Sequence, residues 1–443
     1  MMRKNIFKFG LWGAFIFFIS LSIGGAAKAE NVASSASESL TEEAAIQRVM
    51  QNNYDRKSAL VSIEIARQEL MKAGLWPNPE AEFSLVTDRF YADQGEGSRE
   101  FGLSQALPVS GRINFQKKVA KLGIERAEWQ VKDFERLLIA SVKKIFYEIL
   151  ILQEKEKVLS SLVELNEKLL EVVQSRLSHA EVSQIDLSLT NGELQVARQE
   201  LFEAKALLYE KRATLNRLMG LHFNEPFVIQ SGLTTVFSET LDLENLIGKA
   251  LENRPDLKAK AIEEKMGEGA LQLARKMRIP DITVGGFYQK EKSRFEVDGK
   301  LEMDDDKLIG FRVSLPLPLF DRKQADIAEA NAEKKKASIE ILDLKIQVEE
   351  EVAQAVIRDN ASKEILDSYG NGVLESIEKS VQLIQDAYAQ GQVSFLDVVQ
   401  TQGKFKSIQI AYLGALQNHK ESLIELEVAM GMDLKNEKEG KNQ

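Results

Sequence analysis

The positions of proline constrain this fold more than any other feature of the sequence. All eight prolines lie outside two long segments, residues 113–219 and 323–430, which are rich in aliphatic and charged residues. Because proline interrupts a helix interior, each segment is predicted to form a helical hairpin. The predicted helices are residues 113–178, 186–219, 323–388 and 397–430. A helix of about 66 residues is roughly 100 Å long, so it must pack along most of its length.

Coiled-coil spacing is present within the first long helix. Leu138, Ile145, Leu152 and Leu159 recur every seven residues, with Val142 and Ile149 between them. This pattern is typical of helices that pack side by side. On this evidence alone, an ordinary coiled-coil rod fits as well as a hairpin.

The two hairpins belong to two similar halves of the chain. Pro79 precedes Pro280 by 201 residues (280 − 79), and Pro108 precedes Pro318 by 210 (318 − 108). The segments HAEVSQIDL and QGQVSFLDV, which start at residues 179 and 390, differ by 211 (390 − 179). These landmarks keep the same order, so we predict an internal duplication whose second copy has gained about nine residues in a loop.

Each half is predicted to contain an opening helix, a strand pair and a long helical hairpin. The first half is residues 41–220, with a helix at 41–75 and strands at about 80–107. The second half is residues 239–431, with a helix at 241–278 and strands at about 281–316. Among these helices only the one that contains Pro255 is expected to kink or break. The other segments are a signal peptide (1–29), linkers (30–40 and 221–238) and a polar tail (432–443).

The strand segments alternate between apolar and mostly polar residues. In AEFSLVTDRF the residues Ala81, Phe83, Leu85 and Thr87 share one face, and in the second half Ile309, Phe311, Val313 and Leu315 do the same. Strands of about ten residues with this period are long enough to cross a bilayer. The segments YADQGEGS and EVDGKLEMDDD are expected to be polar connecting loops in water. A sheet half buried against protein gives the same alternation in any single strand.

Four strands cannot close a transmembrane barrel, because the smallest known barrels have eight. An open sheet edge in lipid would leave backbone groups without hydrogen bonds. The chain is therefore expected to share a barrel with copies of itself, and the helices would continue from the strand ends as a tube of about 100 Å. The predicted fold class is mixed, with long α-helical hairpins and two β-hairpins.

The N-terminal residues have the pattern of a secretory signal. Arg3, Lys4 and Lys8 precede an apolar stretch at residues 11–23, and Ala27 and Ala29 precede Glu30. The alternative, a membrane anchor, is disfavoured because the apolar stretch is shorter than the roughly 20 residues of a spanning helix. We expect an exported protein with a cleaved signal peptide.

Composition excludes several classes of function. The chain contains no cysteine, which excludes disulfides, thiolate metal sites, a cysteine nucleophile and a lipid anchor on cysteine. The net charge of −10 and the lack of a basic run argue against nucleic-acid binding. His179, His222 and His419 are scattered, without a second ligand at metal spacing, and no phosphate loop or nucleophile triad is present. We expect no enzyme activity, no metal site and no cofactor.

The strand-to-helix junctions carry a second set of candidate residues. LPVSGRINF and LPLPLFDRK each follow the last strand of their half. Proline is tolerated at the end of a sheet, and Ser110 and Asp321 are expected to lie at the starts of the long helices, with Ser110 as a cap. The junction candidates are Pro108, Gly111, Arg112, Pro316, Pro318, Asp321 and Arg322.

The VSxxD turns, residues 182–186 and 393–397, begin the returning helices. A serine or aspartate at such a position can cap the helix by accepting a bond from its free backbone N–H groups. The turn candidates are Val182, Ser183, Asp186, Val393, Ser394 and Asp397. Capping explains these residues without any further role.

The duplicated halves, strand pairs, long hairpins and VSxxD turns together resemble the TolC family of outer membrane factors, over nearly the whole mature chain. GLWPNPE (residues 74–80), NRPDL (253–257) and LPLPLFDRKQADIAEA (315–330) are most similar to the CzcC branch, the outer membrane partners of heavy-metal efflux pumps. The resemblance implies a homotrimer with a twelve-stranded transmembrane β-barrel in outer membrane lipid and an α-barrel in the periplasm. It also implies two partners, a periplasmic adaptor (membrane fusion) protein and an inner-membrane proton-driven efflux pump.

The resemblance further implies that the VSxxD turns form a closed periplasmic tip. By position, Asp186 matches the first-turn aspartate of the family, Tyr388 the locking tyrosine, and Asp397 one position of an acidic ring. Gln400 stands at the second ring position, and Val393 stands where the family has its locking arginine. These two departures lead us to expect a looser or differently held gate. For Asp186 and Asp397, capping and gating remain equal alternatives.

The resulting functional hypothesis is an exit duct that passively conducts heavy-metal cations or small toxic molecules to the exterior. Two alternatives stay open. One is a duct for a type I protein secretion system, and the other is a periplasmic coiled-coil scaffold outside the membrane.

Overall fold

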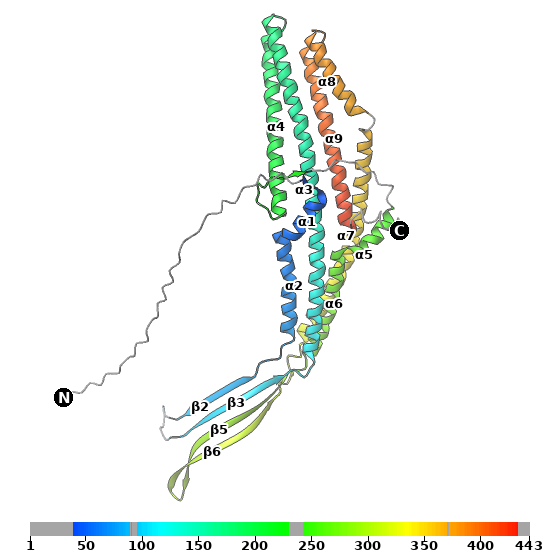
Figure 1. Cartoon of the computed structure of the whole chain (residues 1–443). Helices are drawn as coiled ribbons and strands as arrows, with labels where there is room; N and C mark the ends of the chain where they lie inside the picture. Colours follow the sequence, from blue (N-terminus) through cyan, green and yellow to red (C-terminus); the bar gives the residue numbers. More distant parts are fainter. Residues whose placement is uncertain (1–38, 89, 91–94, 230–241, 370–371, 433–443) are drawn as a thin grey trace, which may run out of the picture. The chain divides into compact units, whose positions relative to one another are not determined.

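The computed structural model describes residues 39–88, 90, 95–229, 242–369 and 372–432 (Figure 1). The predicted signal peptide, most of the first linker, half of the second linker and most of the polar tail lie outside the described residues.

Both halves of the chain begin in the order helix, helix, strand, strand, and then continue with two helices in the first half and three in the second. The first half contains α1 (Glu42–Asn52), α2 (Tyr54–Ala73), β2 (Glu80–Thr87), β3 (Gly97–Leu107), α3 (Arg112–Ser178) and α4 (Gln184–Leu218). The second contains α5 (Leu243–Asn253), α6 (Pro255–Lys276), β5 (Ile282–Val297), β6 (Lys300–Ser314), α7 (Gln324–Ser368), α8 (Val373–Ala389) and α9 (Phe395–Met430). The short strands β1 (Ser39–Leu40) and β4 (Val228–Ile229) pair in parallel.

The helix α3 is the central packing element, because it contacts α1, α2, α4, α6 and α9. One buried cluster joins it to α1 and α4 and includes Val142, Phe146, Ile149 and Leu215. A second cluster joins α5, α7 and α9 and includes Val348, Val352 and Leu426. The seven-residue spacing of α3 therefore serves helix-to-helix packing. The described helices include none that combines the length and the apolar composition of a membrane span.

Both opening helices are broken, and the two breaks have the same environment. The break before Pro255 follows from proline, but the break at Asn53 differs from the single helix expected over residues 41–75. The Nδ2 of Asn53 donates to the Leu218 carbonyl at 2.9 Å, and its Oδ1 accepts from the Arg56 N–H at 2.8 Å. Asn53 therefore ends α1, caps α2 and binds the end of α4.

The glycine that follows each returning helix packs against these breaks. Gly220 and Gly431 have φ of 70° and 71°. An added Cβ at Gly220 would lie 2.9 Å from the Asn52 carbonyl, and one at Gly431 would lie 2.9 Å from the Cα of Arg254. The backbone conformation and the close approach both require glycine here, which explains why LNRLMG and LEVAMG recur.

The second long helix differs from the expected continuous helix over residues 323–388. The helix α7 ends at Ser368, and α8 begins at Val373. The intervening sequence, YGNG, contains two glycines, and Gly372 has φ of 86°. Glycine costs about 1 kcal/mol in a helix interior relative to alanine, so the break falls where helix propensity is lowest.

The strands β2, β3, β5 and β6 form one antiparallel sheet in that order. Phe83 pairs with Phe101, Phe101 with Tyr288, and Tyr288 with Ile309. Directly paired residues point to the same side of a sheet, so the apolar positions of all four strands share one side. We call this side the apolar face; its exposed members are Phe83, Leu85, Phe101, Leu103, Val284, Tyr288, Ile309, Phe311 and Val313.

The opposite side of the sheet is mostly polar, although it also holds Val86, Phe287 and Leu308. The guanidinium of Arg312 donates to the Glu100 carboxylate at 2.9 Å and lies 5.1 Å from the centre of the Phe287 ring. Phe287 covers Gly310, where an added Cβ would come within 2.6 Å of ring atom Cε1. Glycine at position 310 therefore makes room for the ring.

The segment EVDGKLEMDDD is mostly strand, so the prediction of a loop over residues 296–306 was wrong. The turn consists of Asp298 and Gly299, with φ of 50° and 77°, and pairing resumes at once between Val297 and Lys300. Asp-Gly is a preferred sequence for such a two-residue hairpin turn. As a result, β5 and β6 continue past Lys292, the last β5 residue that pairs with β3.

Candidate functional site

The candidate site lies where the turns of the two helical hairpins approach each other. Ser183 and Ser394 are the N-caps of α4 and α9. The Ser183 hydroxyl accepts from the Asp186 N–H at 3.2 Å, and the Asp186 carboxylate accepts from the Ser183 N–H at 3.0 Å. Ser394 and Asp397 make the same two bonds, at 3.3 and 3.0 Å. Each VSxxD sequence is thus a capping box.

The charge of Asp397 is stabilised by its cap. The hydrogen bond from the Ser394 hydroxyl and the bond from the Ser394 N–H hold the pKa of this carboxyl below its ordinary value. Asp397 is exposed to solvent and remains ionised at neutral pH. It therefore presents a fixed negative charge at the second hairpin turn.

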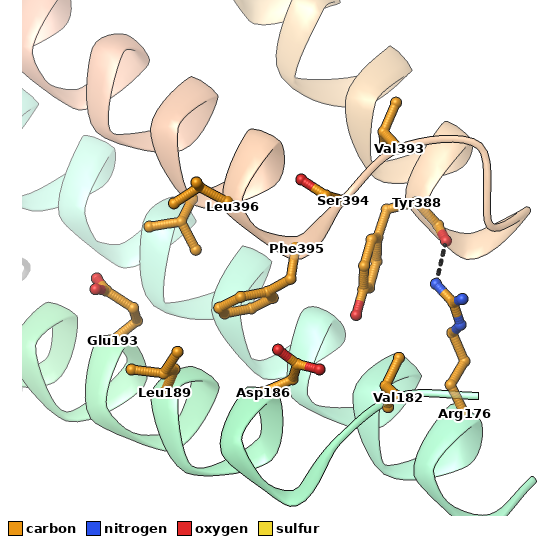
Figure 2. Close-up of a pocket in the computed structure, with 11 residues that line it drawn as sticks. Arg176, Val182, Asp186, Leu189, Glu193, Tyr388, Val393, Ser394, Phe395 and Leu396 are labelled. Carbon is orange, nitrogen blue, oxygen red and sulfur yellow. Dashed lines mark hydrogen bonds between the residues drawn. The ribbon is translucent and has the colours of Figure 1, made fainter. Parts of the chain in front are cut away.

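A pocket of about 500 Å³ lies between the two turns (Figure 2). Its walls come from the ends of α3 and α8 and the beginnings of α4 and α9. The lining residues are Arg176, Val182, Asp186, Leu189, Glu193, Tyr388, Val393, Ser394, Phe395, Leu396 and Val399. Most are apolar, and Arg176, Asp186 and Glu193 supply the charges.

Arg176 connects the two hairpins. From the end of α3, its Nη1 donates to the Tyr388 carbonyl at 3.0 Å, and its guanidinium lies 4.9 Å from the centre of the Tyr388 ring. Its Nε donates to the Glu181 carboxylate at 3.1 Å. Figure 2 shows this side chain reaching from the first hairpin to the second. We call the contact between Arg176 and Tyr388 the arginine clasp.

Tyr388 is the most buried aromatic residue of the pocket, with 2% of its surface exposed. Its ring packs edge-on to Phe395 and belongs to a cluster with Leu169, Val173 and Val398. Burial raises the pKa of Tyr388; the nearby Arg176 opposes this shift, and the carboxylate of Asp186 adds to it. The hydroxyl has no hydrogen-bond partner among the described residues, and Figure 2 shows it directed toward the turn that holds Asp186 and Val182.

The structure brings together five of the predicted turn candidates in the pocket lining: Val182, Asp186, Tyr388, Val393 and Ser394. Ser183, Asp397 and Gln400 are exposed and do not line the pocket. Arg176 was missed by sequence reasoning. The signal for it was a lone arginine in the last turn of a long helix, where a cation is favoured by the helix dipole.

At the strand-to-helix junctions the helix starts differ from the prediction. The N-cap of α3 is Gly111, with φ of 72°, and the N-cap of α7 is Lys323, with φ of 58°. The Ser110 hydroxyl accepts a bond from the Arg112 N–H at 3.3 Å, and the Asp321 carboxylate accepts one from the Lys323 N–H at 2.8 Å. Ser110 and Asp321 therefore support the turn before the helix and do not cap it.

The prolines of the junctions follow the strands, and the two arginines make different contacts. Pro108 follows β3, and Pro316 and Pro318 follow β6, where no ladder bond is lost. Arg112 forms a two-bond ion pair with Asp281 at 2.6 and 3.2 Å, which joins the start of α3 to the start of β5. Arg322 is exposed, and its Nε donates to the Leu319 carbonyl at 3.4 Å.

His419 differs from His179 and His222, which are both exposed. His419 lies inside α9 and is fully buried, with its Nδ1 3.3 Å from the Asp359 carboxylate of α7. Lys363 also pairs with Asp359, at 2.5 Å. Within the part of the chain that the structure describes, no group of three or more metal-ligating side chains is present.

Comparisons with known proteins agree with this architecture. Residues 246–432 match the model of the outer membrane efflux protein family. The chain is 24% identical to the cobalt-zinc-cadmium resistance protein CzcC of Cupriavidus metallidurans, over 94% of this chain and 96% of that protein. It is 18% identical to the probable outer membrane lipoprotein SilC of Salmonella typhimurium, over 87% of this chain and 84% of that protein.

Solved structures share the fold at low sequence identity. CusC matches with a TM-score of 0.71 and 15% identity, over 88% of this chain and 92% of that one. The CmeC outer membrane channel of Campylobacter jejuni matches with 0.71 and 16%, over 90% and 88%. The MtrE outer membrane channel of Neisseria gonorrhoeae matches with 0.69 and 18%, over 89% and 89%. The resemblance of this chain to the TolC-type outer membrane factors, with CzcC among its relatives, is therefore confirmed.

Proposed function

We propose that this protein is the outer membrane exit duct of a tripartite efflux system. It conducts its substrates passively and catalyses no reaction. The energy comes from an inner-membrane proton-driven pump, and a periplasmic adaptor protein connects the pump to the duct.

The observation that carries this proposal is the apolar face of the sheet. Its nine members come from all four strands and are exposed, with Phe311 at 90% and Ile309 at 82%. A soluble protein rarely exposes a continuous apolar surface of this kind. The opposite side holds Arg312, Glu100 and Glu82 in ion pairs. Lipid on one side and water on the other account for both compositions.

A closed barrel requires further copies of the chain. The outer edges of β2 and β6 have no strand partner among the described residues, and backbone groups at such edges must be paired in lipid. Three copies with four strands each give the twelve-stranded barrel of a homotrimer. In this proposal the two halves of the chain arose by duplication, so the trimer has six similar units.

Exposed apolar stripes on the outer helices support the same assembly. The helix α4 exposes Ile185, Leu189 and Val196, and α7 exposes Ile339, Leu342 and Ile346. These residues are three, four or seven positions apart, so each set lies on one helix face. Packing of α4 from one chain against α7 and α8 of the next would cover both stripes and complete a helical tube in the periplasm.

The pocket between the hairpin turns is the proposed gate of this tube. In this proposal Arg176 replaces the locking arginine that the family has at the position of Val393. Arg176 comes from the first hairpin and binds the end of α8 in the second. In the closed state the arginine clasp keeps the two hairpins together. The carboxylates of Asp186 and Asp397 attract cations to the opening, while Gln400 contributes no charge.

The proposed substrates are heavy-metal cations or small toxic molecules. The name of the relative CzcC refers to cobalt, zinc and cadmium, and the similarity covers nearly the full length of both proteins. The metal here is cargo, and no resident metal site is proposed. The chain is exported through a cleaved signal peptide and resides in the outer membrane.

Two neighbouring residues of β6 provide a sharp test. Ile309 belongs to the apolar face, and Leu308 points to the opposite side, yet both are exposed aliphatic residues. A lysine on a lipid-facing position near the bilayer midplane costs about 2–4 kcal/mol. Ile309→Lys should therefore reduce the amount of folded, heat-resistant trimer in the outer membrane fraction, and Leu308→Lys should leave it near the wild-type level.

The same fractionation decides between the proposal and a periplasmic scaffold. A wild-type protein found in the soluble periplasmic fraction would refute the exit duct. Equal loss of trimer in both lysine variants would show that the two sides of the sheet do not differ in their contact with lipid.

A further inference from the structure

The four strand ends that join helices lie next to one another, along the end of the sheet from which the helices continue and not along the outer strands β2 or β6. Glu80 at the start of β2 pairs with Ser104, Leu107 at the end of β3 pairs with Ile282, and Thr283 of β5 pairs with Ser314 at the end of β6. The segments 74–79, 108–112, 276–281 and 315–323 therefore meet along this edge. We call it the helix-side edge.

An exposed apolar residue stands close to a cation at each of these four strand ends. Trp76 follows Lys72, Val109 precedes Arg112, Ile279 follows Arg278, and Phe320 precedes Arg322. Trp76 is 60% exposed and Phe320 is 90% exposed. Leu315, Leu317 and Leu319 are also exposed and continue the alternation of the apolar face beyond the last strand residue, Ser314. Two of these cations are ion-paired, Lys72 with Glu69 and Arg112 with Asp281, so the charges that remain beside the apolar surface are those of Arg278 and Arg322.

Asp281 and Asp321 at this edge are already paired, whereas the exposed Glu80, at the start of β2, forms no ion pair among the described residues. Asp281 binds Arg112 at 2.6 Å, and both Asp321 and Asp326 lie 3.4 Å from the Lys323 ammonium. No carboxylate of the described residues forms an ion pair with Arg278 or Arg322, and both arginines are exposed. A chain with a net charge of −10 thus presents two unpaired arginines at this edge against one unpaired carboxylate, that of Glu80.

We propose that the helix-side edge binds phospholipids with an anionic headgroup, in preference to zwitterionic ones, in the periplasmic leaflet of the outer membrane. This inference rests on the proposed function, because the apolar face must lie in lipid for the edge to meet the headgroups. Arg278 and Arg322 bind the phosphodiester group, for which the planar guanidinium supplies paired donors. The acyl chains lie against Leu317, Leu319 and Phe320, and Trp76 lies at headgroup level, as indole rings do at membrane interfaces.

The preference follows from charge. Phosphatidylglycerol carries one net negative charge, whereas the ammonium of phosphatidylethanolamine neutralises its phosphate. A basic residue near an anionic lipid surface strengthens binding by about fivefold. Removal of two arginines should therefore reduce the preference by roughly 25-fold, and high salt should reduce it as well.

The test compares lipids retained by the purified full-length protein. Wild-type protein, Arg278→Gln/Arg322→Gln and Lys168→Gln/Lys379→Gln are equilibrated in detergent with equimolar phosphatidylglycerol and phosphatidylethanolamine, and native mass spectrometry counts each lipid per chain. The lysine control removes the same charge from exposed positions of α3 and α8, far from the sheet in sequence. Insertion is measured separately, as resistance to carbonate extraction from vesicles of phosphatidylcholine alone.

Enrichment of phosphatidylglycerol on the wild type and the lysine control, with loss in the arginine variant, would support the proposal. Equal retention of the two lipids by the wild type would overturn it, as would unchanged enrichment in the arginine variant. Failure of the wild type to insert into neutral vesicles would count against the proposed function instead, and the lipid count in detergent would still decide the preference.

Discussion

Replacement of Arg176 by methionine isolates the arginine clasp. Methionine keeps the unbranched apolar stem of the side chain but removes the donors and the charge. The Tyr388 carbonyl at the end of α8 then loses its bond from α3, and the Tyr388 ring loses the cation on its face. The capping boxes at Ser183 and Ser394 are left in place.

The size of the effect can be worked out from these contacts. A hydrogen bond from a charged donor contributes about 1.5–3 kcal/mol, and a guanidinium on an aromatic ring contributes about 0.5–1 kcal/mol at a partly exposed site. Arg176 is partly exposed, with 19% of its side chain accessible to solvent. Its ion pair with the exposed Glu181 adds little to the stability of the closed tip. The expected loss is about 2–4 kcal/mol per chain, which shifts the proposed balance between closed and open tips by roughly 30- to 900-fold.

Conductance of the purified protein in a planar bilayer measures this balance. Arg176→Met should increase the open fraction strongly, and Arg198→Met should not. Arg198 is a matched control because it pairs with Glu167 at 2.7 Å within the first hairpin. Conductance of Arg176→Met equal to that of wild type, with the trimer intact, would refute the view that the clasp holds the tip closed.

The absence of cysteine permits a second, direct measurement of the tips. The chain contains no cysteine, so spin labels at Gln174→Cys and Gln392→Cys attach only there. Both positions are exposed, one near the end of α3 and the other in the turn before α9. In samples diluted with unlabelled chains, the distance distribution between the labels should broaden in Arg176→Met. An unchanged, narrow distribution would contradict the clasp independently of conductance.

Three further outcomes are expected. Ser394→Ala should reduce the free energy of unfolding by about 1 kcal/mol through loss of the cap, and an unchanged denaturant midpoint would contradict this. Burial acts to raise the pKa of Asp359, but hydrogen bonds from His419 and Lys363 hold this pKa below its ordinary value. The stability that the ionised Asp359 contributes should therefore be present above about pH 4. It should be lost as the pH falls through the pKa of Asp359 in the folded state. Asp359→Asn should weaken the decrease of the melting temperature at acid pH. An unchanged decrease would show that the protonation of Asp359 is not coupled to unfolding. Gly310→Ala should lower the yield of folded protein, because its Cβ meets the Phe287 ring, and Phe287→Leu should restore the yield; failure of this rescue would count against the contact.

Local and periodic features of the fold could be predicted from the sequence. Alternation placed Phe83 with Leu85 on one face of its strand and Ile309 with Phe311 on one face of another, because strand geometry alone determines which side chains share a face. The capping boxes at Ser183 and Ser394 follow from spacing within four residues. The length of α3 follows from the absence of proline and from its heptad spacing.

Features that depend on distant contacts were missed. Arg176 meets Tyr388 across 212 residues of sequence, and its place in the last turn of a long helix does not indicate a partner in the second hairpin. The break at Asn53 depends on the Leu218 carbonyl, 165 residues away. The buried pair of Asp359 and His419 lies on two helices whose relative register no local pattern determines. The break between α7 and α8 is a different case, because the glycines of YGNG were a local signal for it.

The unequal lengths of the two β-hairpins have a consequence for how a living cell displays this protein. The pairing of β5 with β6 continues for five residue pairs beyond Lys292, from Ser293 with Asp304 to Val297 with Lys300. At about 3.4 Å per residue, this adds roughly 17 Å to the hairpin past the last contact with β3. In the proposed orientation the extension rises from the outer surface of the bacterium, three times per trimer. In this proposal it is therefore a surface epitope, and an antibody against the Asp298–Gly299 turn should recognise the duct on intact cells without entering the membrane.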